Sequence, residues 1–144
     1  MRGADQCGAR LGEQEKVSAK SFLSIAAVLA ALAVLLGAFG AHGLKAQLTP
    51  EMLAVYQTAV QYHMWHALGL GIVALTAFHW PRTNGLQWTA GLMIAGIVLF
   101  SGSLYALALT NIKMLGVVTP FGGLAFILAW IVFAVSVWKS SKYR

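Results

Sequence analysis

The chain has 144 residues, of which 59% are apolar and only 10% are charged, whereas a soluble domain carries about 25% charged residues. Four long segments with almost no charge account for this composition, so we expect a single membrane domain and no separate soluble catalytic module. The formal net charge of +6 comes from basic residues in tails and short loops, which indicates membrane topology and excludes a nucleic-acid-binding protein.

The first segment, residues 1–20, is polar and mixes acidic, basic and glycine residues, which predicts a mobile N-terminal tail. A cleaved signal peptide is the alternative, because Lys16 and Lys20 precede an apolar run. That run is about as long as a full bilayer span, which favours a first membrane helix over residues 21–41. The only cysteine, Cys7, lies in the tail, which excludes an intrachain disulfide and a multi-cysteine metal centre.

Three further membrane helices are predicted. A threonine N-cap followed by a proline at the first helical position, Thr49 and Pro50, indicates the start of a helix over residues 51–79. This segment is longer than a hydrocarbon core of about 30 Å requires, so its polar first turns are expected at the membrane surface. The third helix is predicted at residues 86–109. The fourth is predicted at 120–138, again after a Thr-Pro pair.

Charge predicts the orientation of these helices. Four spans place both termini and the second loop on one side of the membrane, and that side carries eight of the ten lysines and arginines. Because positively charged loops stay in the cytoplasm, both termini are predicted to be cytoplasmic. We therefore expect an all-α integral membrane protein, a four-transmembrane-helix bundle formed by residues 21–140, in the cell inner (cytoplasmic) membrane.

The segment YQTAVQYHMWH, residues 56–66, is unusually polar for a membrane helix. On a helical wheel its tyrosines and histidines share one arc, and its two glutamines lie nearly opposite. A helix that is polar on two sides is poorly suited to face lipid, because unpaired polar groups there cost free energy. We therefore expect this helix to be enclosed, with the glutamines bonding to neighbouring helices or to a second subunit.

The predicted topology brings polar residues of other segments to the level of this helix, in the outer half of the bilayer. The candidate polar cluster comprises His42, Gln57, Gln61, Tyr62, His63, His66, Ser101, Ser103, Tyr105 and Thr119. Small residues let membrane helices approach each other closely. Close helix packing is predicted at Gly37, Gly40, Gly91, Gly96, Gly102, Gly122 and Gly123.

Four segments also carry a family resemblance. They are LGAFGAHGLK (36–45), QYHMWHALGL (61–70), LFSGSLYALAL (99–109) and VTPFGG (118–123). In order and spacing they resemble the bacterial family called domain of unknown function 423, or UPF0382, whose members are small inner-membrane proteins. The resemblance covers about residues 22–138. It implies a four-helix membrane protein, and it implies no particular biochemical activity.

Catalytic and metal chemistry finds little support in the sequence. His63 and His66 are close enough on one helix to hold a metal ion, but no apolar segment offers a carboxylate or a cysteine as a further ligand. Two histidines on one helix do not readily bind haem from both faces. Ser101 or Ser103 with His66 lacks the carboxylate that orients a catalytic base. We predict no catalytic residue, no metal and no cofactor.

These observations favour a non-enzymatic membrane subunit or adaptor. Its expected partners are the lipid bilayer and either further copies of the chain or another membrane protein, without nucleic acid. One alternative is an oligomeric transporter or channel for a proton or small solute, with His66 as a gating residue. The other is a lipid-, quinone- or haem-binding protein in which His63 or His66 exchanges protons.

Overall fold

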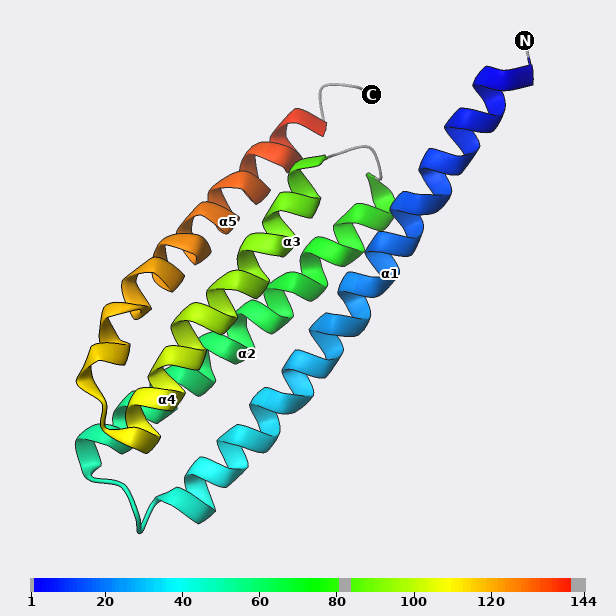
Figure 1. The fold of residues 1–144 in the computed structure, drawn as a ribbon. Helices are drawn as coiled ribbons and strands as arrows, with labels where there is room; N and C mark the ends of the chain where they lie inside the picture. The colour runs from blue at the N-terminus through cyan, green and yellow to red at the C-terminus, as the bar shows by residue number, and fades with distance from the viewer. Residues whose placement is uncertain (1, 81–83, 141–144) are drawn as a thin grey trace.

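The computed structural model describes the backbone of residues 2–80 and 84–140, and the side chains of 18–80 and 84–139. These residues are helical apart from short turns, which confirms the predicted all-helical fold (Figure 1). The elements are α1 (Arg2–Phe39), the π-helix η1 (Gly40–Leu44), α2 (Pro50–His79), α3 (Asn84–Gly96), the π-helix η2 (Ile97–Ser101), α4 (Gly102–Thr110), the 3₁₀-helix η3 (Lys113–Val117) and α5 (Thr119–Ser140).

The segment predicted as an N-terminal tail continues the first helix, because α1 begins at Arg2 and runs to Phe39 without a break. Alanine, glutamate, glutamine, arginine and lysine dominate residues 2–20, no proline interrupts them, and these residue types have high helix propensity. The central residues of the predicted second loop, 81–83, lie outside the described residues. On either side of them, α2 ends at His79 and α3 begins at Asn84.

Figure 1 shows the helices side by side, with the turn from α1 to α2 and the turn from α4 to α5 at one end of the bundle, here called the turn end. At the other end, the termini end, lie the last turn of α2 and the first turn of α3. Helix α2 is central, because it contacts α1, α3, η2 and α4, whereas α5 packs mainly against α3 and η2. The polar helix of the sequence is therefore the one with the most protein around it.

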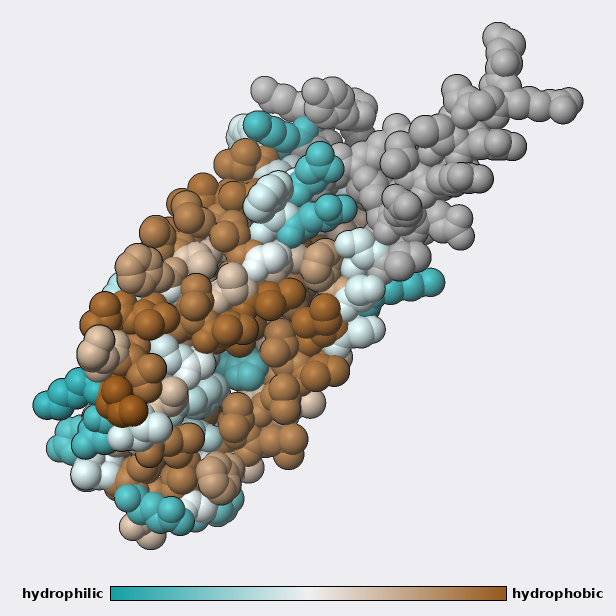
Figure 2. Space-filling view, viewed as in Figure 1, coloured by the Kyte–Doolittle hydropathy of each residue, from teal (hydrophilic) through white to brown (hydrophobic). Residues whose placement is uncertain are grey.

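Three helical stretches of the described residues are long and apolar enough to cross a membrane: Ser18–Leu44, Asn84–Thr110 and Lys113–Lys139. Each has 27 residues, or about 40 Å of helix. Figure 2 shows hydrophobic side chains over most of their length and hydrophilic ones mainly towards the ends. Helix α2 is not one of the three. Its glutamines and two of its three histidines lie within residues 57–66, and it buries nine of its residues inside the bundle.

Glycines set how closely the helices approach at three of the predicted packing positions. A Cβ added at Gly122 would meet the backbone of Phe100, which places α5 directly against η2. At Gly96 an added Cβ would meet the ring of Phe126, and at Gly40 it would lie 2.6 Å from the ring of Tyr56. The other predicted packing glycines have more room: an added Cβ would meet its nearest neighbour at 3.3 Å for Gly37, 3.7 Å for Gly123 and 3.9 Å for Gly102, and would meet nothing within 4 Å for Gly91.

Candidate polar site

Tyr56 begins the polar site near the turn end of the bundle. Its side chain is buried at 1% exposure, and its ring packs where Gly40 of η1 leaves space. The hydroxyl donates a hydrogen bond of 2.9 Å to the backbone carbonyl oxygen of Leu36 in α1. Tyr56 therefore joins α2 to α1 through a polar bond at the centre of an apolar contact.

His63 lies two turns further along α2 and faces α4. Its Nδ1 is 3.3 Å from the hydroxyl of Tyr105, and the Tyr105 ring in turn packs against the Tyr56 ring with centroids 5.1 Å apart. The three side chains thus form a continuous line from α1 towards the middle of the bundle. His63 is 5% exposed, and its Nε2 is buried without a hydrogen-bond partner among the described residues.

His66 is held from both of its ring nitrogens. Nδ1 lies 2.8 Å from the backbone carbonyl of Tyr62 and Nε2 lies 3.2 Å from the indole nitrogen of Trp130 in α5. Because a carbonyl oxygen only accepts and an indole N–H only donates, Nδ1 carries the proton and Nε2 accepts. The ring also stacks on Phe126 with centroids 3.4 Å apart. These contacts make His66 a neutral bridge between α2 and α5.

The two serines of the SGSLY segment differ in their contacts. Ser103 donates to the carbonyl of Phe100 at 3.0 Å, and its hydroxyl lies 2.8 Å from that of Thr119, so it links α4 to the start of α5. Ser101 is fully buried, and its hydroxyl has no hydrogen-bond partner among the described residues. The two hydroxyls therefore belong to different helix contacts.

Three residues of the candidate cluster point away from it. Gln57 and Gln61 are exposed on the side of α2 opposite His63 and His66, and neither side chain makes a hydrogen bond within the described part of the chain. His42 is exposed in η1, also outside the buried cluster. The cluster is thus divided into an interior part, between α2, α4 and α5, and an exterior part on the surface of the bundle.

The contacts of the interior part bear on metal binding and nucleophilic catalysis. No three histidine, cysteine, aspartate or glutamate side chains within the described residues are close enough to share a metal ion. Both nitrogens of His66 are occupied, and Ser103 bonds to Thr119 and not to a histidine. What the arrangement does is tie four segments of the bundle together through hydrogen bonds and stacked rings.

Several residues of the site were not predicted from the sequence. Trp130 and Phe126 of α5 are the partners of His66, and Phe100 of η2 packs on Tyr62 with ring centroids 4.5 Å apart. One feature of the sequence could have identified Trp130 as a site residue. It lies well inside a predicted span, whereas membrane tryptophans are enriched at the interfaces.

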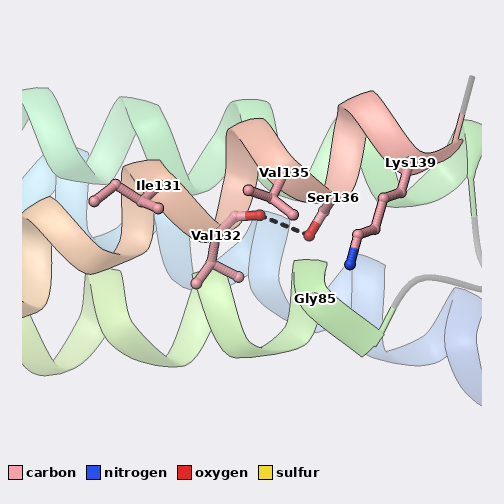
Figure 3. A pocket seen from close by; sticks show the side chains of 6 residues that line it. All are labelled: Gly85, Ile131, Val132, Val135, Ser136 and Lys139. Carbon is pink, nitrogen blue, oxygen red and sulfur yellow. Dashed lines mark hydrogen bonds between the residues drawn. The ribbon is translucent and has the colours of Figure 1, made fainter.

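A separate groove of about 330 Å³ lies at the termini end, between the start of α3 and the end of α5 (Figure 3). An added Cβ at Gly85 would meet the Ser136 hydroxyl, so the two helices approach closely there, and that hydroxyl donates to the carbonyl of Val132 at 2.7 Å. The other polar side chain that lines the groove is Lys139, and the remaining lining residues are apolar or glycine. Its lining is Gly85, Ile131, Val132, Val135, Ser136 and Lys139.

Comparisons with known proteins place this geometry in a family context. The family model described as "Protein of unknown function (DUF423)" matches residues 36–123. The chain is 51% identical over 120 residues to the UPF0382 membrane protein YwdK of Bacillus subtilis. This alignment covers 83% of the present chain and 98% of YwdK. UPF0382 membrane proteins of Staphylococcus haemolyticus and Staphylococcus saprophyticus are 41% and 42% identical over 83% of this chain, and over 97% and 98% of their own lengths. No solved structure matches. Together with the three apolar helices, these relatives identify a multi-pass membrane protein.

Proposed function

The chain belongs to the DUF423 family of membrane proteins, and we propose that it is a non-enzymatic membrane subunit or adaptor. In this proposal α2 is a fourth span, because neighbouring helices bury Tyr56, His63 and His66 and spare these polar side chains from lipid. The protein lies in a bacterial inner membrane with both termini in the cytoplasm, in accordance with the distribution of basic residues. The turn end is then the outer end.

Contacts between helices suggest how deep the polar site lies. His66 stacks on Phe126, which is the middle residue of the span Lys113–Lys139. Near the turn end, Val60 faces Gly37, seven residues before the end of the span Ser18–Leu44. The interior cluster therefore extends from the outer end to about the centre of the membrane. It does so with its polar groups largely bonded to each other, as expected of residues that fix helix packing.

The observation that carries the proposal is the exposed position of Gln61. A 27-residue span of about 40 Å exceeds a hydrocarbon core of about 30 Å by about 5 Å at each end. Gly37 is about 10 Å from the outer end of its helix, so Gln61, beside Val60, lies about 5 Å inside the hydrocarbon. An amide that faces lipid there lacks hydrogen-bond partners, and each unsatisfied group costs several kcal/mol. A partner helix that bonds to Gln61 removes this cost.

The partner surface is a single stripe along α2. It begins with the two glutamines and continues with large apolar side chains at helical spacing, each more than half exposed. Apolar side chains alone are as stable in lipid as against protein, so it is the glutamines that make this surface favour a protein partner. This α2 stripe consists of Gln57, Gln61, Trp65, Leu68, Ile72 and Leu75.

Native mass spectrometry of the full chain, released gently from its own membrane, tests this proposal. We expect the parent protein to carry either a second copy or another membrane protein. The double variant Gln57→Leu/Gln61→Leu should lose that partner, because leucine is compatible with lipid. Gln87→Leu is the matched control, since Gln87 is exposed on α3 and not on the stripe. A parent protein that is always a bare monomer, or a double variant that retains its partner as well as the control does, contradicts the proposal.

A second candidate function is an oligomeric transporter or channel for a proton or small solute. It is favoured by the line of touching polar side chains that runs from Tyr56 through Tyr105 to His63. Flux into liposomes tests it: His63→Phe should reduce proton or solute flux, whereas Gln87→Leu should leave it unchanged. Liposomes that contain the parent protein and show no flux above empty ones exclude this function.

A further inference from the structure

The hydroxyl of Ser101 differs from the other hydroxyls of the bundle. A serine or threonine within a helix commonly bonds to a backbone carbonyl three or four residues earlier. Six residues of the described chain do so, with distances from 2.6 to 3.0 Å: Thr58, Thr76, Thr89, Ser103, Thr110 and Ser136. Ser101 does not, although it is completely buried. Its hydroxyl keeps both its donor and its acceptor capacity.

The π-helix explains why Ser101 is different. Ser101 is the last residue of η2, where the chain makes a wider turn, and the carbonyl of Ile97, four residues earlier, accepts from the backbone N–H of Gly102. In an ordinary α-helix the Ile97 carbonyl would accept from the N–H of Ser101 itself and would lie within reach of its hydroxyl, whereas in the wider turn it is paired one residue further along. Single π turns within α-helices occur frequently at functional sites.

His63 supplies a second buried group without a partner. Its Nδ1 is paired with the Tyr105 hydroxyl at 3.3 Å, and the Nε2 atom has no hydrogen bond within the described residues. A buried polar atom left in this state costs about 1–3 kcal/mol. One such atom is an ordinary imperfection of packing, but two in one helix contact point to a common occupant.

Contacts on both sides of His63 and Ser101 place them in one interface. Tyr62, just before His63, packs on Phe100, just before Ser101, with ring centroids 4.5 Å apart. His63 itself reaches Tyr105, which lies one helical turn after Ser101 on the same face. The contact between α2 and the η2–α4 helix therefore holds both residues in one interface.

We propose that His63 and Ser101 form a binding site for one small, neutral, hydrogen-bonding molecule, with water as the occupant, which bridges His63 Nε2 and Ser101 Oγ. The ligand is neutral because the buried polar residues of the described chain are histidines, serines and a threonine, with no lysine, arginine, aspartate or glutamate to balance an ion. Buried water typically makes about three hydrogen bonds to groups that would otherwise lack them. The site does not depend on the partner stripe and exists whether the chain is an adaptor or a transporter.

A thermal unfolding cycle with the full-length protein in detergent tests the bridge. If water joins the two groups, Ser101→Ala lowers the Tm by about 3 °C. In a His63→Phe background the same change has no such effect, because the bridge is already gone. Ser136→Ala is the control, since that hydroxyl bonds only to its own helix. A Tm for Ser101→Ala that equals or exceeds the parent value, or an equal loss in both backgrounds, overturns the proposal.

Nuclear magnetic resonance supplies a direct reading that does not depend on stability. In parent protein with isotope-labelled histidine, reconstituted in lipid nanodiscs, the ring protons of His63 should show a cross-relaxation peak with water, and Ser101→Ala should abolish it. His66 is the internal control, because Tyr62 and Trp130 occupy both of its nitrogens. A parent spectrum without the His63 peak overturns the assignment of water to this site.

Discussion

The contact in which α5 approaches the backbone of η2 can be tested by a pair of neighbouring glycines. Gly122 and Gly123 both lie in the first turns of α5, so Gly→Ala changes helix propensity by a similar amount at each, a gain of up to about 1 kcal/mol. Their surroundings differ. An added Cβ at Gly122 would lie 2.7 Å from both Cα and Cβ of Phe100, whereas at Gly123 it would lie 3.7 Å from the Phe100 ring.

The expected magnitude follows from this difference. Overpacking that forces backbone to move costs typically about 1–3 kcal/mol, and the propensity terms cancel between the two variants. Gly122→Ala should therefore be less stable than Gly123→Ala by about 1–3 kcal/mol, with Gly123→Ala close to the parent or slightly above it. Gly91→Ala is a second control, because nothing lies within 4 Å of its added Cβ.

Reversible unfolding by sodium dodecyl sulfate in mixed micelles, followed by tryptophan fluorescence, measures these differences in the free energy of unfolding. Equal stability of Gly122→Ala and Gly123→Ala would refute the close approach of α5 to η2. So would a Gly122→Ala variant more stable than the parent, because an unstrained Gly→Ala change within a helix is expected to stabilise.

Two further predictions concern the bridge to α5 and the topology. Trp130→Phe keeps an aromatic ring but removes the donor to His66 Nε2, so it should lower the free energy of unfolding by about 0.6–1.7 kcal/mol. In the same micelle assay, Trp88→Phe, which alters a ring that is 70% exposed, should change it less, and equal losses would refute the bridge. For topology, Cys7 is the only cysteine, so a membrane-impermeant maleimide should label it only after the cells are permeabilised. A cysteine at position 113 in a Cys7→Ser chain should be labelled in intact cells, and the reverse pattern would contradict cytoplasmic termini.

The sequence predicted most where hydrophobic periodicity carried the information. The helical wheel separated the histidines from the glutamines, but it did not predict which side is buried: both sides were expected to be enclosed, whereas in the structure His63 and His66 are buried and Gln57 and Gln61 are exposed. The predicted N-cap is also present in the structure: the Thr49 side chain accepts a hydrogen bond from the backbone N–H of Met52 at the start of α2. The cap depends on local residue types only, so no knowledge of tertiary structure was needed to predict it.

The partners of the buried groups could not be predicted for a physical reason. Tyr56 bonds to the backbone carbonyl of Leu36, and His66 to that of Tyr62, and every residue offers such a carbonyl whatever its side chain. The π-helices likewise have no residue signature comparable to a proline or a cap. The sequence around Ser101 is that of an ordinary helix. It therefore did not predict that η2 leaves the Ser101 hydroxyl without a bond to a carbonyl of its own helix.

The bonding of His66 also bears on the choice between the proposed functions. A gating histidine must gain and lose a proton, but Nδ1 already carries one and Nε2 receives the indole N–H of Trp130. A second proton, on Nε2, would face that donor, so His66 cannot be protonated until α2 and α5 separate locally. His63 has no such restraint on its Nε2. If the chain moves protons, flux must therefore respond to His63→Phe, while His66→Phe acts through stability. If it is an adaptor, both substitutions affect stability alone, and the partner is lost only when the glutamines of the α2 stripe are replaced.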